Sequence, residues 1–401
     1  MSEVFEGSFT QQEAIPEAGI ERAIEVMRSG RLHRYNTAPG EVAETVLLEQ
    51  EFAALVGAKY CLAVASGGYA MATALRAVGV KPGDKVLTNA FTLAPVPGAI
   101  AAVGAVPVFV GVTAQLVIDL EDLAEKAAQA DVLLLSHMRG HLADMEALMA
   151  ICDAAGVTVI EDCAHTMGAA WNGVPSGTQG KVGCYSCQTY KHVNSGEGGL
   201  FVTDDPEVAA RAVMLSGSYM MYERHLAGPP AEAFDQVRYE TPNISGRMDN
   251  LRAAILRPQL ADLATQCARW NERYHTIEAG LRETPGLTVI ERPEAETIVG
   301  SSIQFLLFGW SGAAVEEVLS RCLARGVELK WFGGAEPVGF TSRYDSWRYV
   351  DAPAMPESDK VLEGIVDMRV PLTFSLKDCA LIARIIKAEV GAVYQSGAHQ
   401  P

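Results

Sequence analysis

The chain has 401 residues, of which 49% are hydrophobic and 20% charged, and its formal net charge is −17. This length and apolar content are sufficient for one large domain with its own core and a smaller domain beside it. The acidic balance, without a cluster of lysines and arginines, argues against nucleic acid or an anionic membrane as the main partner.

The first residues, MSEVFEGSFTQQEAIPE, are acidic and lack an apolar core, so we expect no signal peptide. The longest apolar runs contain proline and glycine and do not predict a membrane span. Eight cysteines scattered over a long chain are typical of reduced thiols and favour a cytoplasmic location. Cys184 and Cys187 form a lone CxxC without a second pair, which we interpret as packing rather than a redox or metal motif. We therefore expect no metal site.

Short apolar runs alternate with helix-like stretches between residues 55 and 205. Most runs are continuous, as in strands that are buried on both faces. They occupy residues 60–66, 85–89, 106–110, 131–136, 157–162, 182–187 and 198–203. This pattern predicts an α/β domain with a mostly parallel, seven-stranded sheet and right-handed crossovers. Its ligand should lie beyond the carboxyl ends of the strands.

The pattern changes after residue 205. Residues 217–243 show little periodicity and predict a long loop that serves the active site or an interface. Apolar residues then recur at three- and four-residue steps and predict a long helix over about residues 247–282. We divide the chain into an N-terminal arm and large domain, residues 1–245, and a small C-terminal α+β domain, residues 246–401.

Three features lie at predicted strand ends of the same sheet. Ser66, Gly67 and Gly68 end a strand and open a helix, where free backbone N–H groups suit a phosphate. Asp162 follows an apolar strand and either caps the next turn or holds a heterocyclic nitrogen protonated. Lys191 lies in TYKHVNSGEGG and is either an exposed loop lysine or a nucleophile activated by desolvation or a nearby cation.

Together these features form the set that pyridoxal phosphate requires: a turn for the phosphate, a carboxylate for the pyridinium nitrogen and a lysine for the Schiff base. No GxGxxG segment follows a strand, which disfavours a dinucleotide site.

From about residue 10 to residue 390 the chain resembles the DegT/DnrJ/StrS-type aminotransferases, fold-type I enzymes that use pyridoxal 5′-phosphate. The segment SCQTYKHVNSGEGG is similar to the family's S-F-x-x-x-K-N-x-x-x-GEGG, which implies that Lys191 forms the Schiff base and Ser186 binds the cofactor phosphate. EDCAHTMGA resembles EDxAQxxGA and implies that Asp162 pairs with the pyridinium nitrogen. SHMRGHLADME and SGRMDNLRAAILRPQL resemble two further family segments.

Several positions depart from the family pattern. Gly68 replaces a threonine near the phosphate, and His165 replaces a glutamine that bonds the cofactor's phenolic oxygen, so its charge is expected to vary with pH. Leu93 stands where a stacking aromatic is expected, and Phe91 is the alternative cover for the ring. Ser245 stands where an asparagine reaches the phosphate of the neighbouring subunit, and a homodimer with active sites at its interface is implied.

The resemblance implies ping-pong transamination. An amino donor, glutamate or glutamine, leaves its amine as pyridoxamine phosphate, and a keto acceptor, typically a nucleotide-linked keto-sugar, then takes it. Lys191 would move protons and Asp162 would keep the ring nitrogen charged. The alternatives are a non-sugar keto acceptor, another reaction such as a lyase or dehydratase, or a non-catalytic regulatory protein. Dehydratase relatives replace the lysine, and the intact lysine–aspartate pair argues against a regulatory protein.

Other residues carry weaker signals. His137 and His141 are interpreted as a polar pair near the site rather than as catalytic groups. Trp331 and Phe332, in residues 329–340, belong either to a substrate pocket or to a packed turn. Four arginines are candidates for binding a substrate carboxylate or phosphate, although most surface arginines do neither: Arg211, Arg224, Arg247 and Arg252.

Overall fold

The central sheet has seven strands, one for each apolar run, in the order β1-β9-β8-β5-β4-β2-β3. The computed structural model describes residues 3–398. β9 is antiparallel to both of its neighbours, and all other neighbouring pairs are parallel, which confirms a mostly parallel sheet. The strands are β1 (Tyr60–Val64), β2 (Lys85–Asn89), β3 (Val106–Val110), β4 (Val132–Ser136), β5 (Thr158–Asp162), β8 (Val182–Ser186) and β9 (Gly199–Thr203).

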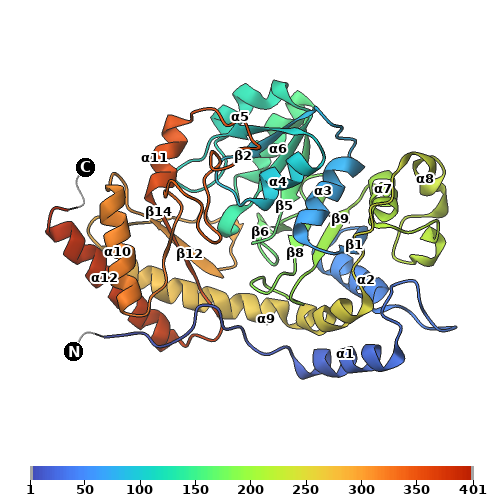
Figure 1. Ribbon diagram of the computed structural model, residues 1–401, viewed down its shortest axis with the longest axis horizontal. Coiled ribbons are helices and arrows are strands. Elements are labelled where there is room, and N and C mark those ends of the chain that lie inside the picture. The colour runs from blue at the N-terminus through green and yellow to red at the C-terminus, as the bar shows by residue number, and fades with distance from the viewer. Residues whose placement is uncertain (1–2, 399–401) are drawn as a thin grey trace.

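Helices cover the two faces of this sheet and extend into the smaller part of the molecule (Figure 1). They are α1 (Glu17–Ser29), α2 (Glu44–Val56), α3 (Gly67–Ala77), α4 (Pro95–Ala102), α5 (Leu120–Lys126), α6 (Met145–Ala155), α7 (Pro206–Ser216), α8 (Val237–Glu240), α9 (Asn250–Leu281), α10 (Gly312–Ala324), α11 (Pro356–Gly364) and α12 (Leu376–Gln395). Four short 3₁₀ helices occupy Ala127–Gln129, Met138–Gly140, Tyr222–Arg224 and Ala231–Phe234.

The strands read as continuous apolar runs because both faces of the sheet are buried. In β1, Cys61 and Ala63 pack on the face covered by α2, α6 and α9, whereas Leu62 and Val64 pack on the face covered by α3, α4 and α7. Successive side chains of a strand point to opposite faces, so a strand between two helical layers needs apolar residues at every position.

A smaller antiparallel sheet, in the order β10-β12-β14-β13, lies beside the large one. Its strands are β10 (Thr288–Val289), β12 (Ser302–Leu306), β13 (Lys330–Trp331) and β14 (Ile365–Arg369). A third sheet pairs β11 (Glu296–Thr297) with the hairpin of β6 (Ala170–Trp171) and β7 (Val174–Pro175), and so joins the two parts of the chain. A smaller α+β unit next to the large sheet agrees with the predicted fold class.

The long helix α9 runs along the lower edge of both parts in Figure 1. Its predicted apolar stripe is buried, with Leu260 and Trp270 against the large core and Tyr274 and Leu281 against the small one. The N-terminal segment also joins the small core, because Phe5 and Phe9 pack edge-on against Phe374 at ring-centroid distances of 4.8 and 5.0 Å. The division of the chain at residues 245 and 246 stays a prediction.

Residues 217–243 contain three short helices rather than an uninterrupted loop. Phe234 and Val237 are buried in the core beneath α7, which anchors the segment against the large domain. None of these residues lines the cavity described below. Within residues 3–398, no helix combines the length and the apolar character that a membrane crossing requires.

Candidate active site

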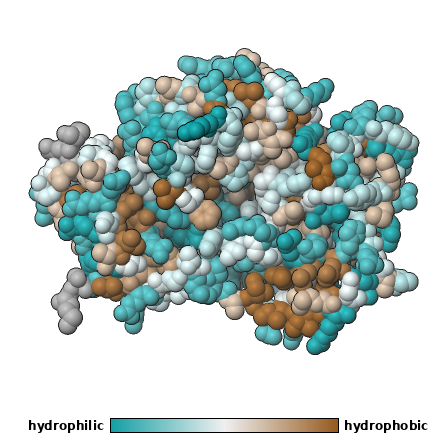
Figure 2. Space-filling view, viewed as in Figure 1, coloured by the Kyte–Doolittle hydropathy of each residue, from teal (hydrophilic) through white to brown (hydrophobic). Residues whose placement is uncertain are grey.

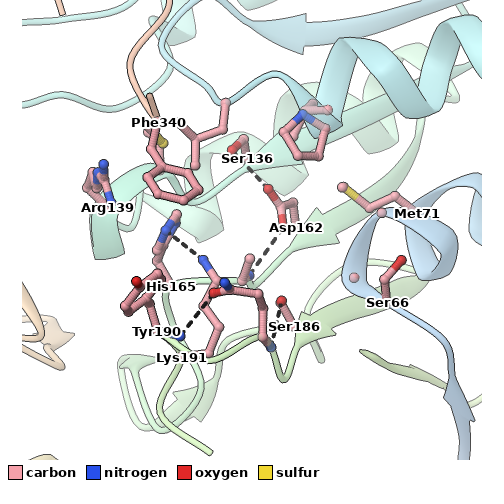
Figure 3. A pocket seen from close by; sticks show the side chains of 18 of the residues that line it. Ser66, Met71, Ser136, Arg139, Asp162, His165, Ser186, Tyr190, Lys191 and Phe340 are labelled. Carbon is pink, nitrogen blue, oxygen red and sulfur yellow. Dashed lines mark hydrogen bonds between the residues drawn. The ribbon is translucent and has the colours of Figure 1, made fainter. Parts of the chain in front are cut away.

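A cavity of about 300 Å³ opens at the carboxyl ends of β4, β5 and β8, the edge at which the parallel sheet should bind its ligand. The strand register places Ser136 beside Asp162, and Asp162 beside Cys184, so the ends of the three strands are level. Figure 3 shows Lys191 and Asp162 in the middle of this cavity, between Ser66 on one side and Arg139 on the other.

Lys191 lies in the loop between β8 and β9, which the glycines fold back on itself. Cys187 N–H donates to the carbonyl of Gly198 at 2.8 Å, and Gly196 adopts the left-handed conformation with φ 83°. The Lys191 amine lies 2.9 Å from His165 Nε2. Burial, together with the nearby Arg139, lowers the pKa of the amine to about 7, although Asp162 raises it. A large share of this amine is therefore uncharged and nucleophilic at neutral pH.

Asp162 is the last residue of β5 and is buried, with 7% of its surface exposed. Ser136 Oγ donates to one carboxylate oxygen at 3.1 Å, and the Ala164 N–H donates to the other at 3.2 Å. These hydrogen bonds fix the orientation of the carboxylate, but burial still raises its pKa. The carboxylate therefore lacks a strong cationic partner, which a protonated ring nitrogen would supply.

The predicted phosphate turn opens helix α3. Ser66 caps the helix by accepting a hydrogen bond from the Tyr69 N–H at 3.1 Å, and the first intrahelical bond begins at Ala70. The N–H groups of Gly67 and Gly68 precede that bond and belong to the unpaired donors that make a helix N-terminus an anion site. A Cβ on Gly67 would lie 2.9 Å from Ser186 Cβ, so the missing side chain lets β8 approach the helix.

His165 lines the cavity and contacts Lys191, but its expected pH-dependent charge is not what the structure indicates. Burial, followed by the nearby Lys191 and Arg139, lowers its pKa well below the ordinary value of 6.5. The imidazole is therefore neutral at physiological pH. It can exchange a hydrogen bond with the amine without competing for its proton.

Of the two residues considered for covering the cofactor ring, the structure places only Leu93 at the cavity. Phe91 is 1% exposed and packs edge-on against Phe332 at 5.1 Å, inside a core between the two parts of the molecule. Of the two alternatives, Leu93 is therefore the one at the cavity, because side chains two residues apart point in different directions once the strand has ended. Ser245 also lies outside the cavity, on an exposed turn where its hydroxyl contacts Tyr219 at 2.9 Å.

The four candidate arginines do not line the cavity. Two form local ion pairs, Arg211 with Glu207 and Arg252 with Asp249, and two bond to backbone carbonyl groups, Arg224 to Tyr35 and Arg247 to Gly217. The arginines at the cavity are Arg139 and Arg369, joined there by Tyr190, Ser301, Ser302 and Phe340. Arg139 follows β4 in SHMRGH, and its place next to a strand end was the available signal. Arg369 ends a strand of the small sheet, and no feature of the sequence around it indicated a site residue.

The histidines beside Arg139 are structural, as expected. His137 contacts Glu161 at 2.9 Å and His141 contacts Gln304 at 2.8 Å, and neither lines the cavity. One possible ligand atom from each of Glu161, His137 and Cys163 lies within 4.8 Å of the other two, a spacing that could hold a metal ion. The Glu161 carboxylate is already saturated, however, by His137 and by three loop N–H groups, those of residues 177, 179 and 180.

The lone CxxC is a packing feature. Cys184 packs in the core on one face of the sheet and Cys187 in the core on the other, and both thiols are free. Burial raises the pKa of Cys187 to about 12, so it remains a protonated thiol.

Residues 14–387 match the model of the DegT/DnrJ/EryC1/StrS aminotransferase family. The chain belongs to this family. It is 32% identical over 290 residues to a dTDP-3-amino-3,4,6-trideoxy-alpha-D-glucose transaminase of Streptomyces venezuelae, with 70% of each chain covered. It is 34% identical over 282 residues to a pleiotropic regulatory protein of Geobacillus stearothermophilus, with 68% of each covered. The aligned stretch spans about two thirds of the length of such curated relatives.

A solved structure of 3-amino-5-hydroxybenzoic acid synthase is similar over 98% of this chain and 100% of its own, with a TM-score of 0.81 and 26% identity. The fold is that of the fold-type I aminotransferases, and the cofactor of the family is pyridoxal 5′-phosphate.

The donor set of the cavity fits this cofactor. A half-buried amine that is partly neutral, a buried carboxylate that forms no ion pair within residues 3–398 and the N-terminus of α3 all line the same 300 Å³ space. Lys191 would hold the cofactor aldehyde, Asp162 the ring nitrogen, and the first turn of α3 together with Ser186 the phosphate.

Proposed function

We propose that this chain is a pyridoxal phosphate-dependent aminotransferase that moves an amino group from glutamate or glutamine to a keto acceptor, with a keto-sugar as the leading acceptor class. The observation that carries the proposal is the meeting of Lys191 and Asp162 in one buried cavity, with the pKa of the amine lowered to about 7. When bound, pyridoxal phosphate supplies an aldehyde and an electron-accepting ring.

Each residue then has a definite task. Asp162, oriented by Ser136 and the backbone of Ala164, keeps the ring nitrogen protonated by placing a buried negative charge beside it. Lys191 would be a neutral base placed to take a proton from the donor's α-carbon and, in the second half-reaction, to give a proton to the acceptor carbon. His165 orients the Lys191 amine through the 2.9 Å contact and remains uncharged.

We further propose that the protein works as a homodimer. Figure 2 shows apolar side chains gathered on the surface over α1 and the start of α9, and Ile20, Met27 and Leu55 are exposed there. A continuous apolar surface of this kind favours a protein partner. In this dimer, Ser245 would reach the phosphate of the neighbouring subunit, as the family resemblance implies. The eight unpaired, buried cysteines support a cytoplasmic location.

The test follows the visible absorbance of the full-length protein loaded with pyridoxal phosphate, before and after an excess of L-glutamate or L-glutamine. Loss of the visible band with release of the matching 2-oxo acid supports the proposal. Lys191→Ala should abolish both signals, whereas Lys181→Ala, which removes a surface partner of Asp205, should leave both intact. A band that neither donor changes would contradict an aminotransferase that uses these donors.

A second candidate is a regulatory protein that binds the same cofactor, which the similarity to the pleiotropic regulatory protein favours. The same experiment separates the two, because a protein without turnover would release no 2-oxo acid. A non-sugar acceptor is the alternative within catalysis, and the similarity to 3-amino-5-hydroxybenzoic acid synthase favours it.

A further inference from the structure

Cationic side chains gather at the side of the cavity away from the phosphate turn. Arg139 and Arg369 line the cavity with Lys191, and Arg369 also lines a second cavity of about 610 Å³ together with Lys330. In Figure 3, Arg139 and Ser66 lie on opposite sides of Lys191.

Buried negative charge in this region is scarce. Asp162 and Asp367 are 7% and 1% exposed, and Asp162 is already assigned to the ring nitrogen. The glutamates that line the two cavities are exposed to solvent: Glu197, Glu316, Glu328 and Glu336. Among residues 3–398, Asp367 is therefore the one buried carboxylate on this side that is not assigned to the cofactor, and it faces Arg139, Lys330 and Arg369. Because unpaired buried cations are costly, a surplus of them at a cavity indicates an anionic ligand.

Arg139 is held rigidly with hydrogen-bonding capacity to spare. Its side chain is 7% exposed and its backbone is left-handed, with φ 56°, a conformation that is uncommon for a residue with a side chain. Nη2 lies 2.9 Å from Asp367 Oδ2, and Gln304 bonds the other oxygen of that carboxylate at 2.7 Å. The ion pair lacks hydrogen-bond alignment, and Nε and Nη2 of Arg139 have no hydrogen-bond partner among residues 3–398.

Arg369 is placed by stacking rather than by an acid. Its guanidinium carbon lies 3.6 Å from the centre of the Tyr190 ring and 5.9 Å from that of Phe340. Arg369 forms no ion pair within the described part of the chain. Burial and the neighbouring Arg139 lower its pKa, although a hydrogen bond to Tyr190 and the charge of Asp367 act in the opposite direction. Stacking leaves the in-plane N–H groups free to bind a carboxylate in a bidentate manner.

We propose that Arg139 and Arg369 bind a carboxylate that the keto acceptor carries close to its reacting carbonyl. The acceptor is then a keto acid, such as a ring ketone with a carboxylate, rather than a compound whose only anion is a distant diphosphate. This inference rests on the proposed aminotransferase function and narrows its substrate class.

Two arguments support a nearby anion. Both arginines are close enough to the Lys191 amine to lower its pKa, and that amine marks the reacting carbon. In a ping-pong reaction, donor and acceptor also occupy the same space in turn, and the donor brings a carboxylate. An acceptor without a carboxylate would leave Arg369 without an ion-pair partner and Arg139 with Asp367 alone during its half-reaction.

The experiment uses the full-length protein reconstituted with pyridoxamine 5′-phosphate, so that the donor step is bypassed. The probes are 3-oxocyclohexane-1-carboxylate and 3-oxocyclohexane-1-carboxamide, which differ in charge but hardly in shape. Their binding is measured by calorimetry and their amination by single-turnover absorbance. We expect the acid to bind at least about tenfold more tightly than the amide, as for other charge-assisted bidentate pairs.

Arg369→Gln should reduce this preference to about one, whereas Arg369→Lys should restore part of it. Arg384→Gln, which alters only an exposed pair with Glu3, should leave it unchanged. Because Arg139→Gln alone would strand the buried Asp367, Arg139 is tested as Arg139→Gln combined with Asp367→Asn.

Equal binding of acid and amide by the wild-type protein would overturn the inference. So would competition by uridine diphosphate that disappears in Arg369→Gln, because the arginines would then bind a diphosphate. A third overturning result is an effect of Arg369→Gln on the glutamate half-reaction alone, which would assign the arginines to the donor. Failure of the proposed function would appear separately, as a wild-type protein that glutamate and glutamine cannot aminate.

Discussion

The lowered pKa of Lys191 leads to a quantitative prediction about how the protein captures its cofactor. An isolated lysine has a pKa near 10.5, and that of Lys191 is about 7. At pH 7, about half of the Lys191 amines are then neutral, compared with about one in 3,000 for an ordinary lysine. The covalent capture of pyridoxal phosphate by the apoprotein should therefore accelerate with a midpoint near pH 7 and reach a plateau by about pH 8.5.

Removing one cation should shift this midpoint in a known direction. Burial and Arg139 are the largest causes of the lowered pKa, Arg369 adds to it, and Asp162 opposes it. Arg369→Gln should raise the pKa of Lys191 by about one unit, which reduces the neutral fraction at pH 7 to about one tenth and slows capture about fivefold. Asp162→Asn should move the midpoint the other way.

The assay is stopped-flow absorbance of the apoprotein mixed with pyridoxal phosphate between pH 5.5 and 9.5, with borohydride trapping and peptide mass analysis to identify the lysine. Lys330→Ala is the matched control, because the pKa of Lys330 is also lowered, to about 8, by its own burial. It should leave the midpoint in place. A midpoint near pH 10 in the wild-type protein would refute the claim that burial and the arginines activate Lys191.

Three further predictions concern other parts of the site and the core. Asp162→Asn should still bind the cofactor but slow the glutamate half-reaction at least about hundredfold, as measured by single-turnover absorbance, and an unchanged rate would remove Asp162 from catalysis. Gly67→Ala should lower both the melting temperature and the cofactor affinity, because its Cβ would lie 2.9 Å from Ser186 Cβ, whereas Gly68→Ala, with no neighbour closer than 3.9 Å, should leave the apoprotein's melting temperature unchanged. Glu49 is buried in α2 and pairs with Arg34 at 2.7 Å. Burial raises its pKa, but Arg34 and His225 lower it to about 2, so Glu49 contributes stability above about pH 4.5 that is lost as the pH falls toward 2. Glu49→Gln should cost about 3–5 kcal/mol at pH 7 and flatten the pH dependence of urea unfolding over that interval.

The large sheet was predictable because its signal is local. Each central strand is buried on both faces and is therefore a continuous apolar run, and all seven runs became strands of one sheet. Most residues predicted for the cofactor, apart from Phe91 and Ser245, also meet, since parallel strands deliver Asp162 and Ser186 to the same edge as Lys191. The choice between Phe91 and Leu93 stayed open because the direction of a side chain after a strand depends on packing that the local sequence does not show.

The substrate side was not predictable in the same way. Arg369 and Ser302 come from the small sheet and Phe340 from a loop between β13 and α11, more than 100 residues after Lys191. They reach the cavity because the small sheet packs beside the large one, a tertiary contact with no local pattern. The sequence also did not show which aromatic residue of the segment 329–340 faces the site. Phe340 lines the cavity, whereas Phe332 is packed inside the core.

The separation of the cofactor side of the cavity from its substrate side has a functional consequence. Of the groups assigned to the cofactor, Asp162 and Ser186 end strands of the large sheet, where the register of buried strands fixes them, and Lys191 follows in the loop after β8. The groups that face the substrate belong largely to the small sheet and to the segment around Phe340, whose side chain is 51% exposed. Substitutions in the second set can alter the charge and shape offered to an acceptor without moving Lys191 or Asp162. Acceptor specificity can thus diverge among relatives while the transamination chemistry is retained, and Arg369 is the position at which this chain should be compared first.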